Sequence, residues 1–343
     1  MAFLLFLAVL LARFLAVAGE ECPAACTGLA TVDLSSWLQG PDGGEALALQ
    51  RAEAAAGFDA AMRSVGMVCV VGTALAPAAA AALEREAAAF FAQDVQQKRL
   101  AGSDWKTYGP EGYTGLGVEA VGRSLGVKAG ADAVESFVFR GAPDGAGALC
   151  RPADAGGALC DAAAAYWAAM EKTLAALHRL STAALIPGAA PDDDIFRPKF
   201  AAGNGNALKL AHYPATGDEE TWRYGEHTDY QTFTLLHLNR TSAKGLEVRG
   251  RGGDWAPVGV LDESAIVVNA GDLTEVWTNG WWRSAPHRVK APAAQPARTA
   301  IAFFTGPAGD AVISPILGSG EAAKYEPVEA GLHLARKIGA TTV

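Results

Sequence analysis

Residues 225–236 read GEHTDYQTFTLL and place a histidine and an aspartate, His227 and Asp229, two positions apart at the start of a hydrophobic segment. Side chains at positions i and i+2 of a β-strand point to the same face, so both groups are expected to project into one space between sheets. An imidazole and a carboxylate in that arrangement form half of a metal site. The segment therefore predicts a β-sheet core with an ion in its interior.

The third ligand is expected from His287, in WWRSAPHRVKAP, at the start of another strand-like segment. Two imidazoles and one carboxylate on one face of an ion form the triad of non-haem Fe(II) oxygenases, which leaves coordination positions open. Arg298 opens the next segment, RTAIAFF, and its guanidinium is suited to hold a dicarboxylate such as 2-oxoglutarate. Tyr213 and Lys209, four positions apart in LKLAHY, share one strand face and are expected to add donors to the same anion.

The segments around these residues predict the fold. From about residue 205 the chain alternates short strand-like runs with Gly, Asp, Asn and Pro, a spacing typical of a double-sheet jelly roll. Strands are expected in ALKLAHYP, QTFTLLHL, GLEVRG, AIVVNAG, EVWTNG, WWRSAPHRV and RTAIAFF. Helical periodicity predicts helices over 45–66, 77–93 and 160–185, and the Gly- and Asp-rich stretch 101–157 predicts loops. The expected fold is mixed α+β, with a helical N-terminal region packed on a jelly-roll core, the double-stranded β-helix.

Composition limits the expected partners. The chain has 343 residues, half of them hydrophobic, which is enough to bury a substantial core. Its 28 basic and 37 acidic residues give a net charge of −9, and no basic cluster is interleaved with aromatic residues. Nucleic acid is therefore not an expected partner. The expected partners are a small-molecule substrate and O2, and we expect a monomer without a stable membrane span.

The N-terminal residues predict targeting. Residues 1–18 form an apolar run that ends in Ala16-Val17-Ala18, the small-residue pattern of a signal-peptide cleavage site. The run is shorter than the roughly 20 apolar residues that a membrane-spanning helix needs. We expect a cleaved signal peptide and a place in the secretory pathway or outside the cell. A plastid-type targeting segment, or a disordered tail on a cytoplasmic protein, remains the alternative.

The five cysteines fit an oxidising compartment. Cys22 with Cys26, and Cys150 with Cys160, are close enough in sequence to form local disulfides, whereas Cys69 in MVCVVG is expected to be a buried free thiol. The alternative is that all five cysteines are free. Asn239-Arg240-Thr241 is an acceptor sequence for N-glycosylation in an expected turn.

The order and spacing of these motifs resemble a known family. HTDYQTFTLL, GLEV, VVNAGDLTEVWTNG, SAPHRV and RTAIAFF are similar to the Fe(II)/2-oxoglutarate-dependent dioxygenases of the isopenicillin N synthase-like family, and TVDLSSW, GYTGLG and ESFVFRGAP are similar to its N-terminal region. The resemblance covers residues 29–318. Behind the leader at 1–18, it implies a helical N-terminal region at 29–158, a jelly-roll core at 159–320 and a C-terminal tail at 321–343.

The resemblance also implies roles for particular residues. His227, Asp229 and His287 would bind Fe(II), and Arg298 would bind the distal carboxylate of 2-oxoglutarate with Tyr213 as its partner. No catalytic residue beyond the metal ligands is implied. The implied reaction is the oxidation of a small organic substrate with O2, by hydroxylation, desaturation or ring closure, with release of succinate and CO2.

Two positions depart from the family pattern. The usual Arg-x-Ser is Arg298-Thr299-Ala300 here, and Ala211 stands two residues before Tyr213, where the family has asparagine. Each lost hydrogen bond costs about 1 kcal/mol, so we expect weaker binding of 2-oxoglutarate, for which Lys209 is a candidate to compensate. Two alternatives therefore stay open. One is an iron oxidase of the same fold that uses O2 directly or with ascorbate, and the other is a non-catalytic jelly-roll binding module.

The substrate cannot be identified from the sequence, but the walls of its pocket can be predicted. We expect them in residues 102–117, the 136–158 loop, 215–225 and the tail after 318, which are the segments most free to vary. Arg223 is expected to be a solvated loop charge, and Asp272 a turn residue. Three tryptophans, Trp277, Trp281 and Trp282, are expected to fill the core.

Overall fold

The computed structural model describes residues 25–40, 43–102, 111–126, 128–141, 148–149, 156–200, 204–218, 221–239 and 244–342. The predicted leader at 1–18, Cys22, Cys150 and the last two residues of the glycosylation sequence lie outside the described residues. Within the described ranges, no helix combines the length and apolar character that crossing a bilayer requires.

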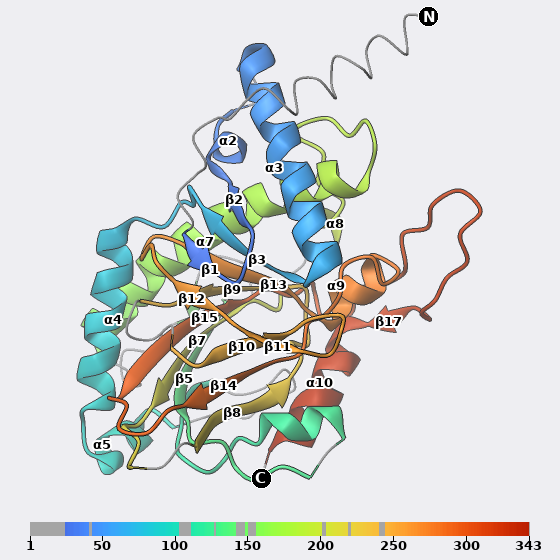
Figure 1. The fold of residues 1–343 in the computed structure, drawn as a ribbon. Coiled ribbons are helices and arrows are strands. Elements are labelled where there is room, and N and C mark those ends of the chain that lie inside the picture. The colour runs from blue at the N-terminus through green and yellow to red at the C-terminus, as the bar shows by residue number, and fades with distance from the viewer. Residues whose placement is uncertain are drawn as a thin grey trace, which may run out of the picture.

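Two β-sheets face each other at the centre of the molecule, with helices around them (Figure 1). The larger sheet has the order β2-β3-β13-β9-β15-β7-β5-β4, and β6 pairs with β5. Its strands are β2 (Thr31–Asp33), β3 (Met67–Val71), β13 (Ile266–Ala270), β9 (Phe233–His237), β15 (Arg298–Phe304), β7 (Ala207–Tyr213), β5 (Glu135–Gly141), β4 (Gly112–Thr114) and β6 (Ala148–Leu149).

The smaller sheet has the order β11-β10-β14-β8. Its strands are β11 (Trp255–Pro257), β10 (Leu246–Arg249), β14 (His287–Ala291) and β8 (Thr221–His227). Two short ribbons lie outside these sheets, one of β1 (Cys26–Thr27) with β12 (Gly259–Val260) and one of β16 (Val312–Ile313) with β17 (Val328–Glu329). The face-to-face arrangement of two sheets agrees with the predicted jelly roll.

The helices cover the larger sheet and close the ends of the sandwich. The three long ones, α3 (Gly44–Ser64), α4 (Pro77–Phe91) and α7 (Gly157–Leu185), coincide with the predicted helices. In α7 the buried side chains recur at helical spacing, and the Trp167 ring meets the ring of Phe303 on β15 at a centroid distance of 4.9 Å. The remaining helices are α2 (Ser35–Leu38), α5 (Val95–Leu100), η1 (Val121–Leu125), α8 (Arg197–Phe200), α9 (Asp272–Trp277) and α10 (Ala330–Thr341).

Three local predictions were wrong. EVWTNG is not a strand, because its first half forms the end of α9, in which Leu273 and Trp277 are buried at the four-residue spacing of a helix. The stretch 101–157 is not all loop, since it contains β4 and β5, and β5 pairs with β7 in the larger sheet. His227 and Asp229 do not share a strand either. His227 ends β8, whereas Asp229 lies in the connection to β9.

A disulfide joins Cys26 to Cys69, across a sequence separation of 43 residues. The predicted pairing of Cys22 with Cys26 and the predicted free thiol at Cys69 are therefore wrong. Cys160 is also disulfide-bonded. The tertiary contact of β1 with β3 decides the Cys26 partner, and spacing along the chain carries no information on such a contact.

Candidate active site

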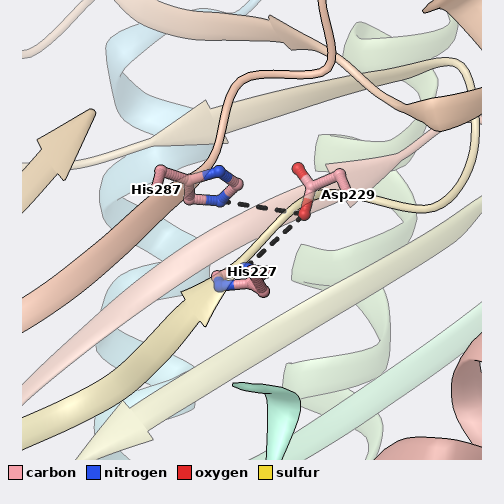
Figure 2. A group of neighbouring side chains, drawn as sticks. All are labelled: His227, Asp229 and His287. Carbon is pink, nitrogen blue, oxygen red and sulfur yellow. Dashed lines mark ion pairs between the residues drawn. The ribbon is translucent and has the colours of Figure 1, made fainter. Parts of the chain in front are cut away.

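Three side chains converge between the sheets. The antiparallel register of β14 and β8 sets His287 opposite His227, and the connection after β8 brings Asp229 beside them. The Asp229 Oδ1 atom lies 3.7 Å from His227 Nε2 and 3.8 Å from His287 Nε2 (Figure 2). One ligand atom from each residue lies within 4.8 Å of the others, and all three residues are buried. The predicted triad therefore exists as a cluster.

Backbone carbonyls orient both imidazoles. His227 Nδ1 lies 2.8 Å from the carbonyl oxygen of Gly225, and His287 Nδ1 lies 3.0 Å from that of Ala285. A ring that donates its Nδ1 proton to a carbonyl presents an unprotonated Nε2, which is the form that binds a metal. Burial, together with the nearby His287, lowers the pKa of His227 to about 3. His227 is therefore a neutral imidazole near pH 7.

Asp229 is also held in one orientation. Its Oδ2 atom accepts hydrogen bonds from Thr234 Oγ1 at 2.5 Å and from Asn269 Nδ2 at 2.7 Å. Burial alone would raise the pKa of Asp229, but the two imidazoles and these two donors lower it below the usual carboxyl value. The carboxylate is therefore ionised with Oδ1 turned toward the histidines. Two imidazole nitrogens and one carboxylate oxygen fit Fe(II).

A cavity beside the triad contains the predicted cosubstrate residues. It is lined by Tyr213 and Arg298 and by both departures from the family pattern, Ala211 and Ala300. The β15–β7 register pairs Arg298 with Tyr213 and Ala300 with Ala211, so the two alanines stand opposite each other in the same wall. The hydroxyl and amide that the family pattern predicts are thus replaced by one continuous apolar patch.

Arg298 has the properties of an anion-binding residue. It is only 6% exposed, and its Nε and Nη1 atoms have no hydrogen-bond partner among the described residues. Its guanidinium carbon lies 4.8 Å from the centroid of the Tyr213 ring, and burial lowers the pKa of Arg298 to about 10. A buried cation with unpartnered donors in a cavity next to a metal site fits a carboxylate ligand. The residues present therefore fit 2-oxoglutarate as well as Fe(II).

A second cavity adjoins the first and shares His227, Asp229, Lys209, Tyr224 and Phe304 with it. Its other walls are mainly apolar and come from several segments, among them Val121, Val138, Ala207, Leu334 and Ile338. Three of the four predicted segments contribute to these walls, namely the 136–158 loop, 215–225 and the C-terminal tail. Much of the fourth, 102–117, lies outside the described residues. Helix α10 closes this cavity and contacts η1 (Figure 1).

Lys209 lines both cavities, but its ammonium has a partner that the sequence did not predict. Lys209 Nζ lies 2.5 Å from Glu119 Oε2 and 3.1 Å from the Tyr224 hydroxyl. Glu119 stands 90 positions away in the sequence, and the only sequence signal for it was its place just after the GYTGLG motif. The role of Lys209 in cosubstrate binding stays a prediction.

Some predictions for neighbouring residues need correction. Arg223 is not a solvated loop charge, because it lies on β8, is 2% exposed and donates from Nη2 to the carbonyls of Pro214 and Pro296. Asp272 begins α9 and pairs with His333 and Lys337 of α10, so it anchors that helix and is more than a turn residue. The prediction for the tryptophans is confirmed, since Trp277 and Trp282 are buried in the core and Trp281 packs against it.

Two family models match this chain, and the match of the first spans the positions of His227, Asp229, His287 and Arg298. A sequence model of the 2OG-Fe(II) oxygenase superfamily matches residues 204–307, and one described as non-haem dioxygenase in morphine synthesis N-terminal matches residues 29–146. The chain is 34% identical over 161 residues to a proline hydroxylase of Petromyces alliaceus and 33% identical over 133 residues to a gibberellin 2-beta-dioxygenase of Arabidopsis thaliana. These matches cover 43% and 38% of this chain, and only 50% and 38% of the two relatives.

Comparison with solved structures confirms the jelly-roll fold. A full-length Neurospora crassa protein in complex with alpha-KG superimposes with a TM-score of 0.75 at 24% identity, over 91% of this chain and 96% of that chain. A 2OG-Fe(II) oxygenase family protein from Caulobacter crescentus superimposes with a TM-score of 0.74 at 24% identity, over 91% and 98% of the two chains. At this identity the likeness establishes the architecture around the triad.

Proposed function

This chain belongs to the isopenicillin N synthase-like family of Fe(II)- and 2-oxoglutarate-dependent dioxygenases, and from that premise we propose that it oxidises a small organic molecule with O2. The observation that carries the proposal is the His227, Asp229 and His287 cluster beside the buried Arg298 guanidinium, two of whose donors have no partner within the described part of the chain. The expected products are the oxidised substrate, succinate and CO2. One oxygen atom of O2 enters succinate, and the other enters the product of hydroxylation or leaves as water in desaturation or ring closure.

Each residue of the site has a defined part in this reaction. The two Nε2 atoms and Asp229 Oδ1 would hold Fe(II), and Arg298, stacked on Tyr213, would bind the far carboxylate of 2-oxoglutarate. Bound Fe(II), with 2-oxoglutarate and O2, supplies the oxidising power that breaks a C–H bond of the substrate. The protein binds and orients the reactants, and its apolar walls exclude water.

The apolar walls of the second cavity support a small, largely apolar substrate. The names of the two curated relatives, a proline hydroxylase and a gibberellin dioxygenase, also denote enzymes of small molecules. Hydroxylation, desaturation and ring closure all begin with the loss of a C–H bond, so the geometry supports each of them.

The test is turnover of 2-oxoglutarate by the protein loaded with Fe(II) without O2 and then exposed to O2. We expect slow release of succinate and CO2 without a substrate, and faster, coupled release when a substrate from a small-molecule panel fits. His287→Ala is the matched control and is expected to lose both iron and turnover. The proposal fails if the wild-type protein binds iron but neither binds nor decarboxylates 2-oxoglutarate.

The apolar patch of Ala211 and Ala300 in the cosubstrate wall favours one alternative. An iron oxidase of the same fold would need no 2-oxoglutarate and would use O2 directly or with ascorbate. Substrate-dependent O2 consumption that requires iron, is independent of 2-oxoglutarate and yields no succinate would favour this alternative.

We also propose that the protein is a monomer that enters the secretory pathway after cleavage of residues 1–18. The Cys26–Cys69 disulfide supports an oxidising compartment, since disulfides are rare in reducing ones. Mass spectrometry of the protein from its natural source tests the cleavage, which predicts Gly19 as the first residue. A natural protein that still carries residues 1–18 would contradict the proposed cleavage. The monomer is tested by light scattering, where the mass of a dimer would contradict it.

A further inference from the structure

A buried carboxylate that has no assigned role lies in the wall of the second cavity. Glu119 is 9% exposed, and both of its oxygens are in use. Oε1 accepts a hydrogen bond from Ser136 Oγ at 2.7 Å, while Oε2 accepts from Lys209 Nζ at 2.5 Å and from the Tyr224 hydroxyl at 2.9 Å. Burial alone would raise the pKa of Glu119, but Lys209 and these donors lower it. The group is therefore an ionised carboxylate paired with a buried ammonium.

Lys209 and Tyr224 connect the two sheets at the boundary between the cavities, and Glu119, in the segment between β4 and η1, accepts hydrogen bonds from both. Lys209 lies on β7, next to the strand that carries Arg298, and Tyr224 lies on β8, which ends at His227. The Tyr224 ring meets the His227 imidazole edge-on, with centroids 4.9 Å apart. Lys209 and Tyr224 line both cavities, whereas Glu119 lines only the second one. Because Glu119 lies on the side of the second cavity, its hydrogen bond draws the Lys209 ammonium toward that cavity.

The charge of this pair matters because the expected cosubstrate is a dianion. Coulomb interactions are several times stronger in a partly buried site than in water. An unpaired ammonium at Lys209 would attract the dianion, and the neighbouring carboxylate of Glu119 cancels most of that attraction. The hydrogen bond to Glu119 also holds the ammonium at the boundary between the two cavities.

We propose that Glu119 is a positioning residue that neutralises Lys209 and keeps it, with Tyr224, in the wall between the two cavities, so that Arg298 alone binds the far carboxylate of the cosubstrate. This inference rests on the proposed function, because it concerns the binding of 2-oxoglutarate. The proposal places the Lys209 ammonium in the wall between the two cavities. It also means that Glu119 affects the affinity for the cosubstrate although Glu119 does not line the cosubstrate cavity.

The test measures the Kd of 2-oxoglutarate for the full chain loaded with Fe(II) under anaerobic conditions, from the visible absorption of the bound complex. Glu119→Gln keeps the size of the side chain and removes its charge, and we expect binding to tighten by about tenfold. The double variant Glu119→Gln with Lys209→Met should return the Kd to within about twofold of the wild-type value, because it removes both charges. Glu226→Gln is the matched control, since Glu226 is a more exposed carboxylate on β8 that pairs with Arg249, and it should leave the Kd unchanged.

Lys209→Met alone tests the proposal independently, which matters if Glu119→Gln does not fold. It leaves the Glu119 carboxylate without its cation near the dianion, so binding should weaken by at least about threefold. A Kd that is unchanged or weaker in folded Glu119→Gln, or unchanged in Lys209→Met, would overturn the inference while leaving the proposed function intact. If the wild-type protein binds iron but no 2-oxoglutarate, the proposed function and this inference both fail.

Discussion

Replacing Arg298 with methionine separates the role of this residue in binding from any role in folding. Its Nε and Nη1 atoms are buried without a partner among the described residues, and each is expected to donate a charge-assisted hydrogen bond to the cosubstrate. Such a bond contributes about 1.5–3 kcal/mol, so two of them give about 3 kcal/mol at the low end. The Kd of 2-oxoglutarate should therefore rise by about 150-fold in Arg298→Met. Arg298→Lys keeps the positive charge but loses the planar pair of guanidinium donors, and it should raise the Kd by about tenfold.

In Arg298→Met the affinity for 2-oxoglutarate should fall, whereas the stability of the ligand-free protein should rise or stay the same. Two buried guanidinium donors without a partner among the described residues cost free energy in the absence of the ligand, so Arg298→Met should keep or increase the free energy of unfolding. The assay is the anaerobic titration with 2-oxoglutarate, together with urea unfolding of the ligand-free protein. Arg249→Met is the control, since Arg249 is partly exposed and pairs with Glu226. Arg298→Met with unchanged affinity, or with a loss of stability that matches its loss of affinity, would refute the assigned role.

Four further outcomes follow from the structure. Ala300→Ser restores a hydroxyl to the cosubstrate wall and should tighten 2-oxoglutarate binding by about fivefold, equivalent to about 1 kcal/mol; an unchanged Kd in the same titration would show that the hydroxyl does not reach the ligand. His287→Ala should abolish stoichiometric iron binding, measured by metal analysis after reconstitution, and full iron content would contradict the site. Replacing Cys26 and Cys69 with serine opens a loop of sequence separation 43 and should lower the unfolding free energy by about 4 kcal/mol, measured by urea unfolding of the oxidised protein. The hydrogen bond from His237, at the end of β9, lowers the pKa of Glu84 below 4.5. The ionised Glu84 therefore stabilises the folded protein above pH 4.5, and this stabilisation is lost as the pH falls through the lower pKa of the folded state. The unfolding free energy of Glu84→Gln should depend less steeply on pH in this acid range, and a profile identical to that of the wild type would contradict this linkage.

The sequence predicted the long helices and most strands of the core, because hydrophobic periodicity is a local property. It failed at EVWTNG, where β-branched and aromatic residues before Asn and Gly resembled a short strand, although Leu273 and Trp277 are buried at helical spacing. It also failed at β5, since a Gly- and Asp-rich neighbourhood hid a strand that is stabilised by its pairing with β7. In both cases the decisive contacts are made with distant segments.

The residue types of the site were determined by the sequence alone. Two imidazoles, a carboxylate and a guanidinium are required by the chemistry, and their order along the chain is specific enough to identify them. The spacing of His227 and Asp229 predicted the correct pair of ligands, although the two residues do not share a strand. Asp229 lies two residues beyond the end of β8, in the connection to β9.

Only the tertiary structure decided which partners those residues have. Antiparallel pairing of β14 with β8 brings His287 to His227, and the path of the segment between β4 and η1 brings Glu119 to Lys209 on β7 across 90 positions of sequence. The same is true of Cys69 and Cys26. Periodicity and spacing record what a residue does within its own strand or helix, whereas contacts between distant strands depend on the register and on how the sheets pack, and no local pattern encodes them.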